Sequence, residues 1–503
     1  MTDTGGANVA PPLLRVTARL WSRLAAPLLA PVRGFRLAYL PLLSVYLASG
    51  ALGIVAVADQ FWVRQSLTLT PADLAALAVW LQLPWVAKMV VSEFVDCVPI
   101  LGSQRRAYIL LGAGLVALGL VLLAGTAGRT ITLAAPEHLY AAAQLLVVVG
   151  SVIQEVVADA MSPEVVARTQ ADGSPRPQAD INRDLAMVEV LARLVYSAGA
   201  FAVALLAGVL AKHFPYQAVF LMGLIVPALS IGGALLVRAE QCRRRPIDRK
   251  IFGGGLVFAA AATLLGVSGL RLAQETVFLL SLGVVCLMLR RVLASLAPEV
   301  RRRIALVAVM IFAYRAVPMI GDGYRWFAMD RLGFDEAFFG VLQLTSTGVG
   351  LIAMWLFADQ LVRRPAGTAL IWLTLMTAFL FLPSLLLVNG AHEWTARVLG
   401  FGARGIALID EAAQSPLFLL ATVPLLALIA IHAPPGQRAT CFALIASLMS
   451  LSVVASQLAT KYVNLIFPVD RGAYEQLPAL VLTVTVSAVA LPLAVIFTLR
   501  RRA

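Results

Sequence analysis

The sequence is poor in charge, in cysteine and in histidine. Only 13% of its 503 residues are charged, whereas an average soluble domain carries about 25%. The four histidines are scattered and no nucleotide-binding loop or nucleophile–base arrangement is present, which argues against an enzyme. We predict no metal and no cofactor, because the cysteines support neither a metal cluster nor a disulfide framework. They too stand singly, at Cys97, Cys242, Cys286 and Cys441.

The sequence is rich instead in long apolar runs. Apolar residues make up 60% of the chain, and its mean hydropathy is +0.87. Many runs of about 20 residues lack charge, which is the length that crosses a bilayer as a helix. The pattern predicts an all-α polytopic protein embedded in a lipid bilayer, with about fourteen transmembrane helices. These are expected near residues 37–60, 73–93, 107–126, 138–161, 185–210, 217–237, 252–270, 275–294, 304–327, 337–360, 366–388, 400–431, 438–464 and 477–499.

The net charge of +13 falls mainly in the loops between these spans. In a soluble chain it would suggest a nucleic-acid partner, but the positive-inside rule explains it without one. With the N-terminus inside, alternating spans put the basic clusters Arg238–Lys250 and Arg290–Arg303 on the inner side. We therefore predict two cytoplasmic termini and a place in the cell membrane, namely a bacterial inner membrane. Residues 1–36 are either an amphipathic helix on the inner surface or a disordered basic tail.

One loop has an unusual order of polar residues. Within residues 81–108, an acidic helix end is followed by a Gly/Pro turn and a basic pair before the next span. This order resembles the cytoplasmic loop between helices 2 and 3 of major facilitator transporters. We expect the carboxylate to pair with a neighbouring helix and the arginines to stay in water, although an ordinary positive-inside loop would need only the two arginines. The motif consists of Asp96, Pro99, Gly102, Arg105 and Arg106.

An internal repeat joins residues 58–77 to residues 321–340, so that Asp59 corresponds to Asp322. Parallel repeats of six helices build the major facilitator class, whose substrate site lies between the halves near the bilayer midplane. The offset exceeds the length of six helices by about two spans, which indicates an inserted pair. The predicted parts are an arm (1–36), an N-terminal half (37–238), a basic linker with two extra helices (239–303) and a C-terminal half (304–503).

Two predicted spans carry ionisable residues near their cytoplasmic ends. Glu155 and Asp159 lie four residues apart in the fourth span, and Glu189 and Arg193 do so in the fifth. Each such group at bilayer depth costs about 2.5 kcal/mol or more, so it needs a partner or a purpose. Consecutive antiparallel helices bring the four groups to similar depth. They form either a proton-responsive gate, in which a carboxylate exchanges its arginine for a proton, or a permanent network of ion pairs.

Arg315 is expected near the midplane of the seventh core helix, where its planar fork suits the carboxylate of an anionic solute. The alternative is a pair with Asp322, seven residues further along the same helical face. Asp410 belongs to another polar group, with Arg404 and Glu411, and with Asp322 it is a candidate for proton coupling. Three glutamines are candidates for lining a polar cavity or for ordinary interhelical hydrogen bonds, namely Gln82, Gln343 and Gln457.

Several stretches in chain order resemble the folate–biopterin transporter family of the major facilitator superfamily. PWVAKMVVSEFVDCVPILGSQRRAYILLG is similar to its Pro-Trp, lysine, Asp, Pro-Ile, Gly and Arg-Arg pattern, and VVADAM to its aspartate motif. FAYRAVP with LGFDEAFFG resembles its seventh-helix arginine–proline and the Gly-Phe that follows, and APPGQRATCFAL its Pro-x-Gly stretch. The stretches are residues 84–112, 156–161, 312–318, 332–340 and 433–444.

The resemblance has two departures. Glu93 stands where the family usually has glycine, and Gln437–Arg438 replaces a glutamate. QEVVADA (154–160) also approaches a motif of the related muropeptide permeases, which carry two extra central helices. The resemblance implies a symporter: a secondary active transporter of an anionic, folate- or pterin-like solute, driven by protons. A muropeptide permease and a non-transporting scaffold or receptor stay open as alternatives, and a scaffold would fill the space between the halves with apolar side chains.

Overall fold

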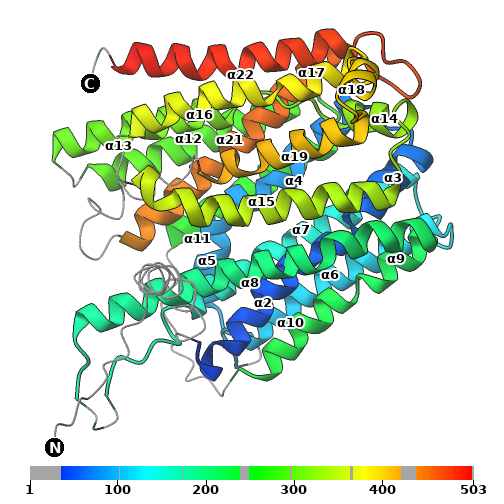
Figure 1. Ribbon diagram of the computed structural model, residues 1–503. Helices are drawn as coiled ribbons and strands as arrows, with labels where there is room; N and C mark the ends of the chain where they lie inside the picture. Colours follow the sequence, from blue (N-terminus) through cyan, green and yellow to red (C-terminus); the bar gives the residue numbers. More distant parts are fainter. Residues whose placement is uncertain are drawn as a thin grey trace, which may run out of the picture.

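The computed structural model describes residues 35–100, 102–170, 172, 174–237, 249–294, 297–362, 366–420 and 438–500. Most of the predicted arm, the start of the basic linker, the end of the span predicted near 400–431 and the start of the 433–444 motif lie outside these residues. The described chain is helical apart from its loops, and its β-structure is limited to isolated bridges in three turns. Figure 1 shows the start of the first described α-helix, α2 (Leu40–Ala51), and the end of the last, α22 (Leu477–Arg500), at the same end of a helical bundle. We call this the terminal end and the opposite one the distal end.

The N-terminal half begins with a bent span. A 3-10 turn, η1 (Leu37–Tyr39), leads into α2 (Leu40–Ala51), and a second one, η2 (Leu52–Val55), leads on into α3 (Ala56–Ser66). Thr70 then caps the next helix reciprocally with Asp73, because each side chain accepts a hydrogen bond from the other residue's backbone N–H. The remaining helices of this half are α4 (Pro71–Val86), α5 (Lys88–Cys97), α6 (Arg106–Ala127), α7 (Pro136–Met161), α8 (Gln178–His213), α9 (Tyr216–Met222) and α10 (Ile225–Leu235).

The C-terminal half begins with a broken span. We predicted one helix over 304–327, and this was wrong: α13 (Pro298–Arg315) ends before Pro318, and α14 (Asp322–Asp330) starts after Gly321. Gly321 has φ +82°, a conformation that glycine adopts without a steric penalty. The other helices are α15 (Glu336–Val362), α16 (Ala366–Leu380), α17 (Leu382–Val388), α18 (His392–Val398), α19 (Ala403–Leu420), α21 (Arg438–Ile466) and α22 (Leu477–Arg500).

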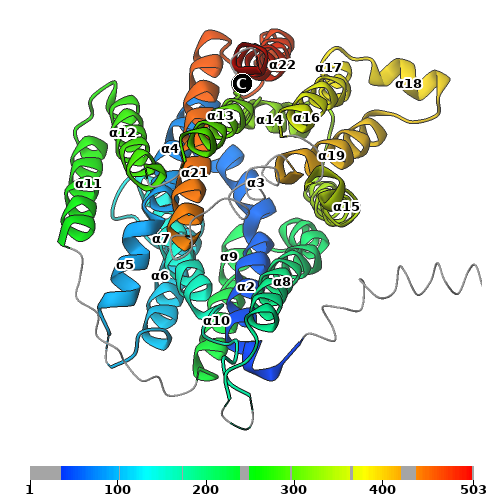
Figure 2. The ribbon, with the colours of Figure 1, turned by 90° about the vertical axis from the view of Figure 1, so that its left-hand side faces the viewer.

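Two further helices lie between the halves in sequence, α11 (Arg249–Val267) and α12 (Ala273–Leu293). They stand at the edge of the bundle, where α11 contacts α5 and α12 contacts α21 and α4 (Figure 2). Lys461 Nζ lies 2.9 Å from Glu275 Oε1, which joins the start of α12 to α21. The pair is thus attached outside the two halves, in contact with both.

The described helices are those of a membrane protein. Among the described residues, eight helical spans are long and apolar enough to cross a bilayer, some of them made of two or more of the labelled helices; they are nine if Thr374–Val388 and His392–Val398 form one bent span. The predicted class is therefore confirmed. The number of fourteen stays a prediction, since several expected spans are divided into shorter helices or lie partly outside the described residues.

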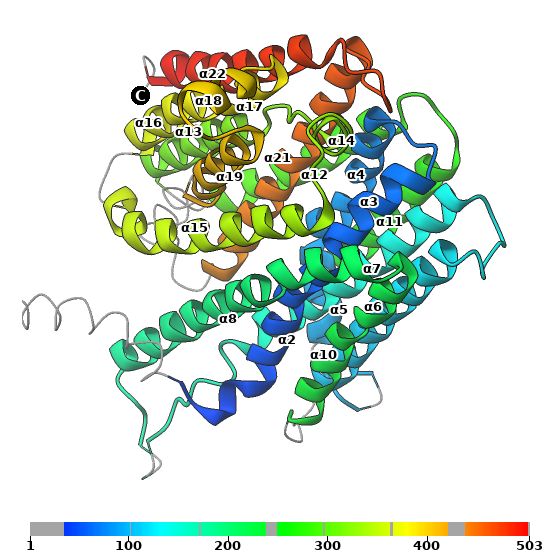
Figure 3. The ribbon, with the colours of Figure 1, turned by 45° about the vertical axis from the view of Figure 1, so that its right-hand side comes forward.

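The two halves meet along two pairs of helices, α8 with α15 and α4 with α21. At the distal end the backbones of α8 and α15 touch, because a Cβ added to Gly208 would lie 2.8 Å from Gly340 Cα. Figures 1 and 3 show these two helices diverging towards the terminal end. Paired glycines allow such close contact between membrane helices.

This contact generates a prediction for Gly208→Ala. The new methyl group would meet Glu336 O at 2.5 Å as well as Gly340, and overpacking of this kind costs about 1–3 kcal/mol. We expect a lower melting temperature in detergent. Gly232→Ala is the matched control, because nothing lies within 4 Å of its added Cβ and alanine favours a helix. Equal melting temperatures for the two variants would contradict the close contact.

Candidate functional site

Ion pairs between the halves close the distal end. Arg64 Nη2 lies 2.5 Å from Asp330 Oδ2, and Lys212 Nζ lies 2.7 Å from Asp335 Oδ2. In each pair the cation belongs to the N-terminal half and the carboxylate to the C-terminal half. The Lys212 hydrogen bond and charge hold the pKa of the Asp335 carboxyl below its usual value.

Arg471 adds a second connection, from the loop before α22 to the turn between α3 and α4. Its guanidinium donates to the backbone carbonyls of Arg64 at 2.9 Å and Leu69 at 3.1 Å, and also to those of Val63 and Leu67. It lies over the ring of Trp326, 4.3 Å from the centroid. Burial and the neighbouring Arg64 lower the pKa of Arg471. We call these contacts, with the two ion pairs, the distal latch.

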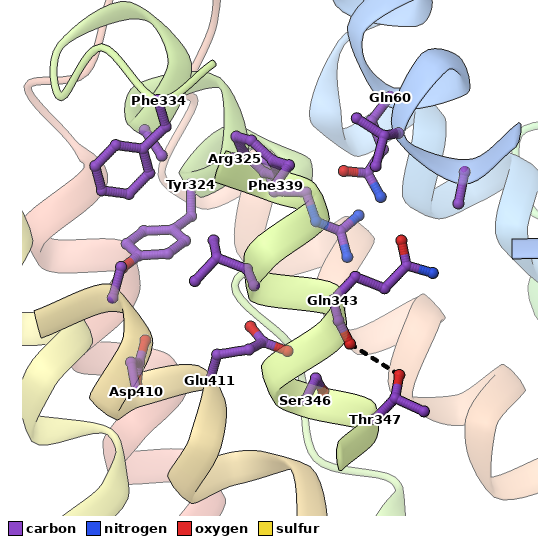
Figure 4. A pocket seen from close by; sticks show the side chains of 15 residues that line it. Gln60, Tyr324, Arg325, Phe334, Phe339, Gln343, Ser346, Thr347, Asp410 and Glu411 are labelled. Carbon is purple, nitrogen blue, oxygen red and sulfur yellow. Dashed lines mark hydrogen bonds between the residues drawn. The ribbon is translucent and has the colours of Figure 1, made fainter. Parts of the chain in front are cut away.

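Two adjoining cavities lie between the halves. Their volumes are about 360 Å³ and about 250 Å³, and both are lined by Ala56, Gln60 and Arg325. The larger is lined by α3 on one side and by α14, α15 and α19 on the other (Figure 4). Its volume falls within the range of about 300–1,000 Å³ that is usual for small-molecule sites. The cavities thus lie between the two halves and form the candidate site.

The two aspartates of the internal repeat line the smaller cavity together. Asp59 accepts hydrogen bonds from Tyr140 Oη at 3.2 Å and Gln144 Nε2 at 3.0 Å. Asp322 pairs with Arg325 Nη1 at 2.9 Å. The sequence repeat thus corresponds to two carboxylates that face one space from opposite halves.

Gln343 and Asp410 line the larger cavity. Asp410 is buried, and its Oδ2 accepts a hydrogen bond of 2.6 Å from Ser384 Oγ. Sequence reasoning missed Gln60 and Arg325 as lining residues. Both lie inside the repeated segments, one residue after Asp59 and three after Asp322, so the repeat itself was the signal that could have found them.

The other three candidate ligands lie elsewhere. Gln82 and Gln457 are half-buried on α4 and α21, which pack together, and neither lines the two cavities. Arg315 does not line them either; its Nε donates to Ser452 Oγ at 3.3 Å. The seven-residue spacing to Asp322 no longer puts the two on one face, because the helix breaks between them.

Hydroxyl groups of α21 form hydrogen bonds with backbone groups in the break between α13 and α14. Ser456 Oγ donates to Val317 O at 2.6 Å, and Met319 N donates to Thr460 Oγ1 at 2.9 Å. An unsatisfied backbone group at membrane depth costs several kcal/mol. These contacts therefore hold open the break that lets α14 turn towards the cavities.

A cluster of carboxylates surrounds Lys88 in the N-terminal half. Lys88 Nζ lies 2.7 Å from both Glu155 Oε1 and Asp159 Oδ2, and Tyr46 Oη donates to Asp159 Oδ1 at 2.5 Å. The cation that joins this pair of acids is therefore Lys88 of α5, whereas the sequence pattern pointed to an arginine. The lysine is 67 residues from Glu155, so local spacing gave no sign of the contact.

The two residues predicted beside this cluster are placed differently. Glu189 accepts a hydrogen bond of 3.0 Å from Ser162 Oγ, just past the end of α7. Arg193 is exposed on α8. The contact with Ser162 places Glu189 beside the end of α7.

The loop motif is held by a buried arginine. We expected both arginines to stay in water; this holds for the exposed Arg106 but was wrong for Arg105, which is 7% exposed. Arg105 donates to Asp96 Oδ1 at 2.9 Å and to both oxygens of Glu164 at 2.7 and 3.2 Å. Burial disfavours its charge, but the hydrogen bonds and charges of these acids raise the pKa of Arg105.

The turn within this motif accounts for the presence of Gly102 and Pro99. Gly102 has φ +77°, and an isolated bridge joins Ile100 to Ser103 around it. Pro99 precedes the bridge, where a helix cannot easily continue. The motif is therefore a tight turn between α5 and α6, in which Arg105 is buried and Arg106 is exposed.

The Lys88 cluster generates a second prediction. Lys88→Gln leaves two neighbouring carboxylates without their cation, and we expect a loss of about 2 kcal/mol in stability. This is below the ~3–5 kcal/mol for a fully buried pair, because the Asp159 side chain is 47% exposed.

The measurement is the melting temperature in detergent, with Lys212→Gln as the matched control. Lys212 loses one surface partner rather than two, since its side chain is 46% exposed and pairs with Asp335. Adding Glu155→Gln to Lys88→Gln should recover part of the loss. A loss as small as that of the control would exclude a structural role for the cluster.

Solved transporters share this fold. A POT family transporter in complex with a thioalcohol-conjugated peptide aligns with a TM-score of 0.64 at 13% sequence identity, over 92% of this chain and 95% of that one. The nucleoside transporter NupG aligns with a TM-score of 0.61 at 11% identity, over 92% and 99% of the two chains. The fold is thus that of a membrane transporter of the major facilitator type.

Sequence comparison gives the family. The profile of the BT1 family matches residues 49–503, so the chain belongs to the BT1 family, whose members are transporters and not enzymes. A folate-biopterin transporter of Synechocystis sp. is 28% identical over 424 residues, which cover 83% of this chain and 72% of the relative. Folate transporter 2 of Plasmodium falciparum is 24% identical over 173 residues, 34% of this chain and 37% of that protein. The resemblance seen in the motifs is confirmed.

Proposed function

We propose that the protein is a secondary active symporter of a folate- or pterin-like solute, driven by protons. The observation that carries this proposal is the cavity between the halves, to which both halves contribute polar side chains. Gln60 comes from the N-terminal half, and Arg325, Gln343 and Asp410 come from the C-terminal half. A scaffold that merely kept the fold would fill this space with apolar side chains. The folate-biopterin relatives support the choice of solute.

The distal latch supports an inward-facing state in this proposal. The terminal end is taken as cytoplasmic, as the positive-inside rule predicts, so the latch closes the outer side. A solute would then reach the cavities from the cytoplasmic side, where α8 and α15 diverge (Figure 3). Alternating access requires the latch to open while the opposite ends approach one another.

Proton coupling is assigned to carboxylates at membrane depth. Asp322 is the first candidate, because a proton on its carboxyl group would release Arg325 towards the cavity. The second is the cluster of Glu155 and Asp159 on Lys88, in which a proton on either acid would loosen the connection of α5 to α7. Glu189 and Asp410 remain candidates of the same kind.

Uptake into liposomes tests the function. With purified protein, we expect labelled folate or biopterin to accumulate when a pH gradient is imposed, and the accumulation to vanish when an ionophore collapses it. Labelled muropeptide is the control solute, because a disaccharide-peptide is much larger than either cavity. Uptake of muropeptide alone would identify a muropeptide permease, and no uptake of any solute would favour the scaffold.

Arg315 retains its proposed role as the partner of a substrate carboxylate. Arg315→Lys keeps the charge but loses the planar fork, so folate, which has carboxylates, should bind about 10-fold more weakly. Biopterin has no carboxylate and should bind as before. The measurement is equilibrium binding of both solutes, with the melting temperature as a check of folding. Unchanged folate affinity in a stable Arg315→Ala protein would exclude this role. Gln82 and Gln457 are also proposed to bind the substrate, and unchanged folate affinity after substitution of either by alanine would exclude that proposal.

A further inference from the structure

The two cavities carry an excess of carboxylates. Among the described residues, four acids line them and Arg325 is the cation. The acids are Asp59 and Asp322 in the smaller cavity and Asp410 and Glu411 in the larger. Such a lining does not suit a solute that presents only negative charge. It suits one that presents N–H donors to at least part of the wall.

Three of these acids already have donors within the protein. Asp59 accepts from a tyrosine and a glutamine, Asp322 from Arg325, and Asp410 from a serine. For the Glu411 carboxylate we find no hydrogen bond or ion pair to any residue that the structure describes. A carboxylate at membrane depth without a partner is costly. Glu411 is therefore the acid of the two cavities for which no described residue supplies a donor, so a ligand can supply one.

The surroundings of Glu411 indicate the shape of that donor. Figure 4 shows its carboxylate directed into the larger cavity, with the amide of Gln343 on the neighbouring helix. The rings of Tyr324 and Phe334 form the wall on one side. Aromatic walls favour a flat ring, and a carboxylate accepts two parallel N–H bonds when the donors are adjacent and coplanar.

We propose that Glu411 determines specificity for the ring of the substrate by accepting two N–H donors from the 2-amino-4-oxopyrimidine edge of a pteridine. The ring N3–H and the 2-amino group each donate to one carboxylate oxygen, while the aromatic wall contacts the ring face. This inference rests on the proposed function and deepens it, since it assigns the ring to Glu411 and leaves a substrate carboxylate to an arginine. The protein therefore recognises the head group that folate and biopterin share.

Pterin and lumazine test the assignment. They differ at one position, where lumazine has a 2-oxo group, an acceptor, in place of the 2-amino donor. We expect the wild-type protein in nanodiscs to bind pterin at least about 10-fold more tightly than lumazine, because the 2-oxo group and the carboxylate oxygen that faces it are both acceptors and neither receives a donor. Glu411→Gln should bind pterin about 10-fold more weakly. It should bind lumazine equally well or more tightly, since its amide can donate to the 2-oxo group.

Glu393→Gln is the matched control. It makes the same chemical change at a side chain that is 69% exposed and pairs with Arg397 on α18, and neither cavity includes it. Its pterin-to-lumazine ratio should equal that of the wild type, and both variants should keep the wild-type melting temperature.

The outcomes separate the inference from the function on which it rests. Suppose that the wild type binds pteridines and that Glu411→Gln lowers the affinities for pterin and lumazine by the same factor. Glu411 then does not recognise the 2-amino-4-oxopyrimidine edge, and the inference is overturned. The same follows if the ratio of the two affinities is unchanged in the variant. If the wild type binds neither pteridine nor folate, the proposed function is itself wrong, and the inference falls with it.

Discussion

The hydrocarbon core of a bilayer offers no hydrogen bonds, so every polar group at its depth needs a partner within the protein, its cavities or its ligands. The helices meet this constraint for most of the backbone. Where the backbone breaks, between α13 and α14, Ser456 and Thr460 of α21 supply the missing partners. Where side chains are charged, partners come from other helices, as Lys88 does for the acids of α7. The positions of these partners determine which helices must pack together.

The same constraint places the candidate site. The break at Gly321 turns α14 so that Asp322 and Arg325 line the cavities between the halves. The repeat-related segment, which follows the 3-10 turn η2, brings Asp59 to the same space from the other half. Both spans thus depart from a regular α-helix within four residues before their acidic residue. Irregular backbone at membrane depth is tolerated where it is buried or lines a cavity, and here it adjoins one.

The sequence predicted what depends on local pattern. Hydropathy located helices such as α6 and α7 to within about two residues, and the repeat predicted that Asp59 and Asp322 correspond. It did not predict the contacts of Lys88 or the burial of Arg105, because both depend on acids far along the chain or on another helix. It treated α13 and α14 as one helix, since Pro318 and Gly321 indicate a weak point but not the direction in which the chain turns.

The distal latch combines several contacts, each of which contributes little free energy by itself. Its ion pairs are partly exposed; in the Lys212–Asp335 pair, 46% and 33% of the side chains remain accessible, and exposed pairs contribute about 0–1 kcal/mol each. A closure built from several small terms can be opened by a ligand that binds the two states with different affinity. In the proposed function, a solute held between Gln60 of one half and Gln343 of the other would lose contacts when the halves separate around it. Binding energy gained in the cavity would thus be coupled to the contacts that close the bundle.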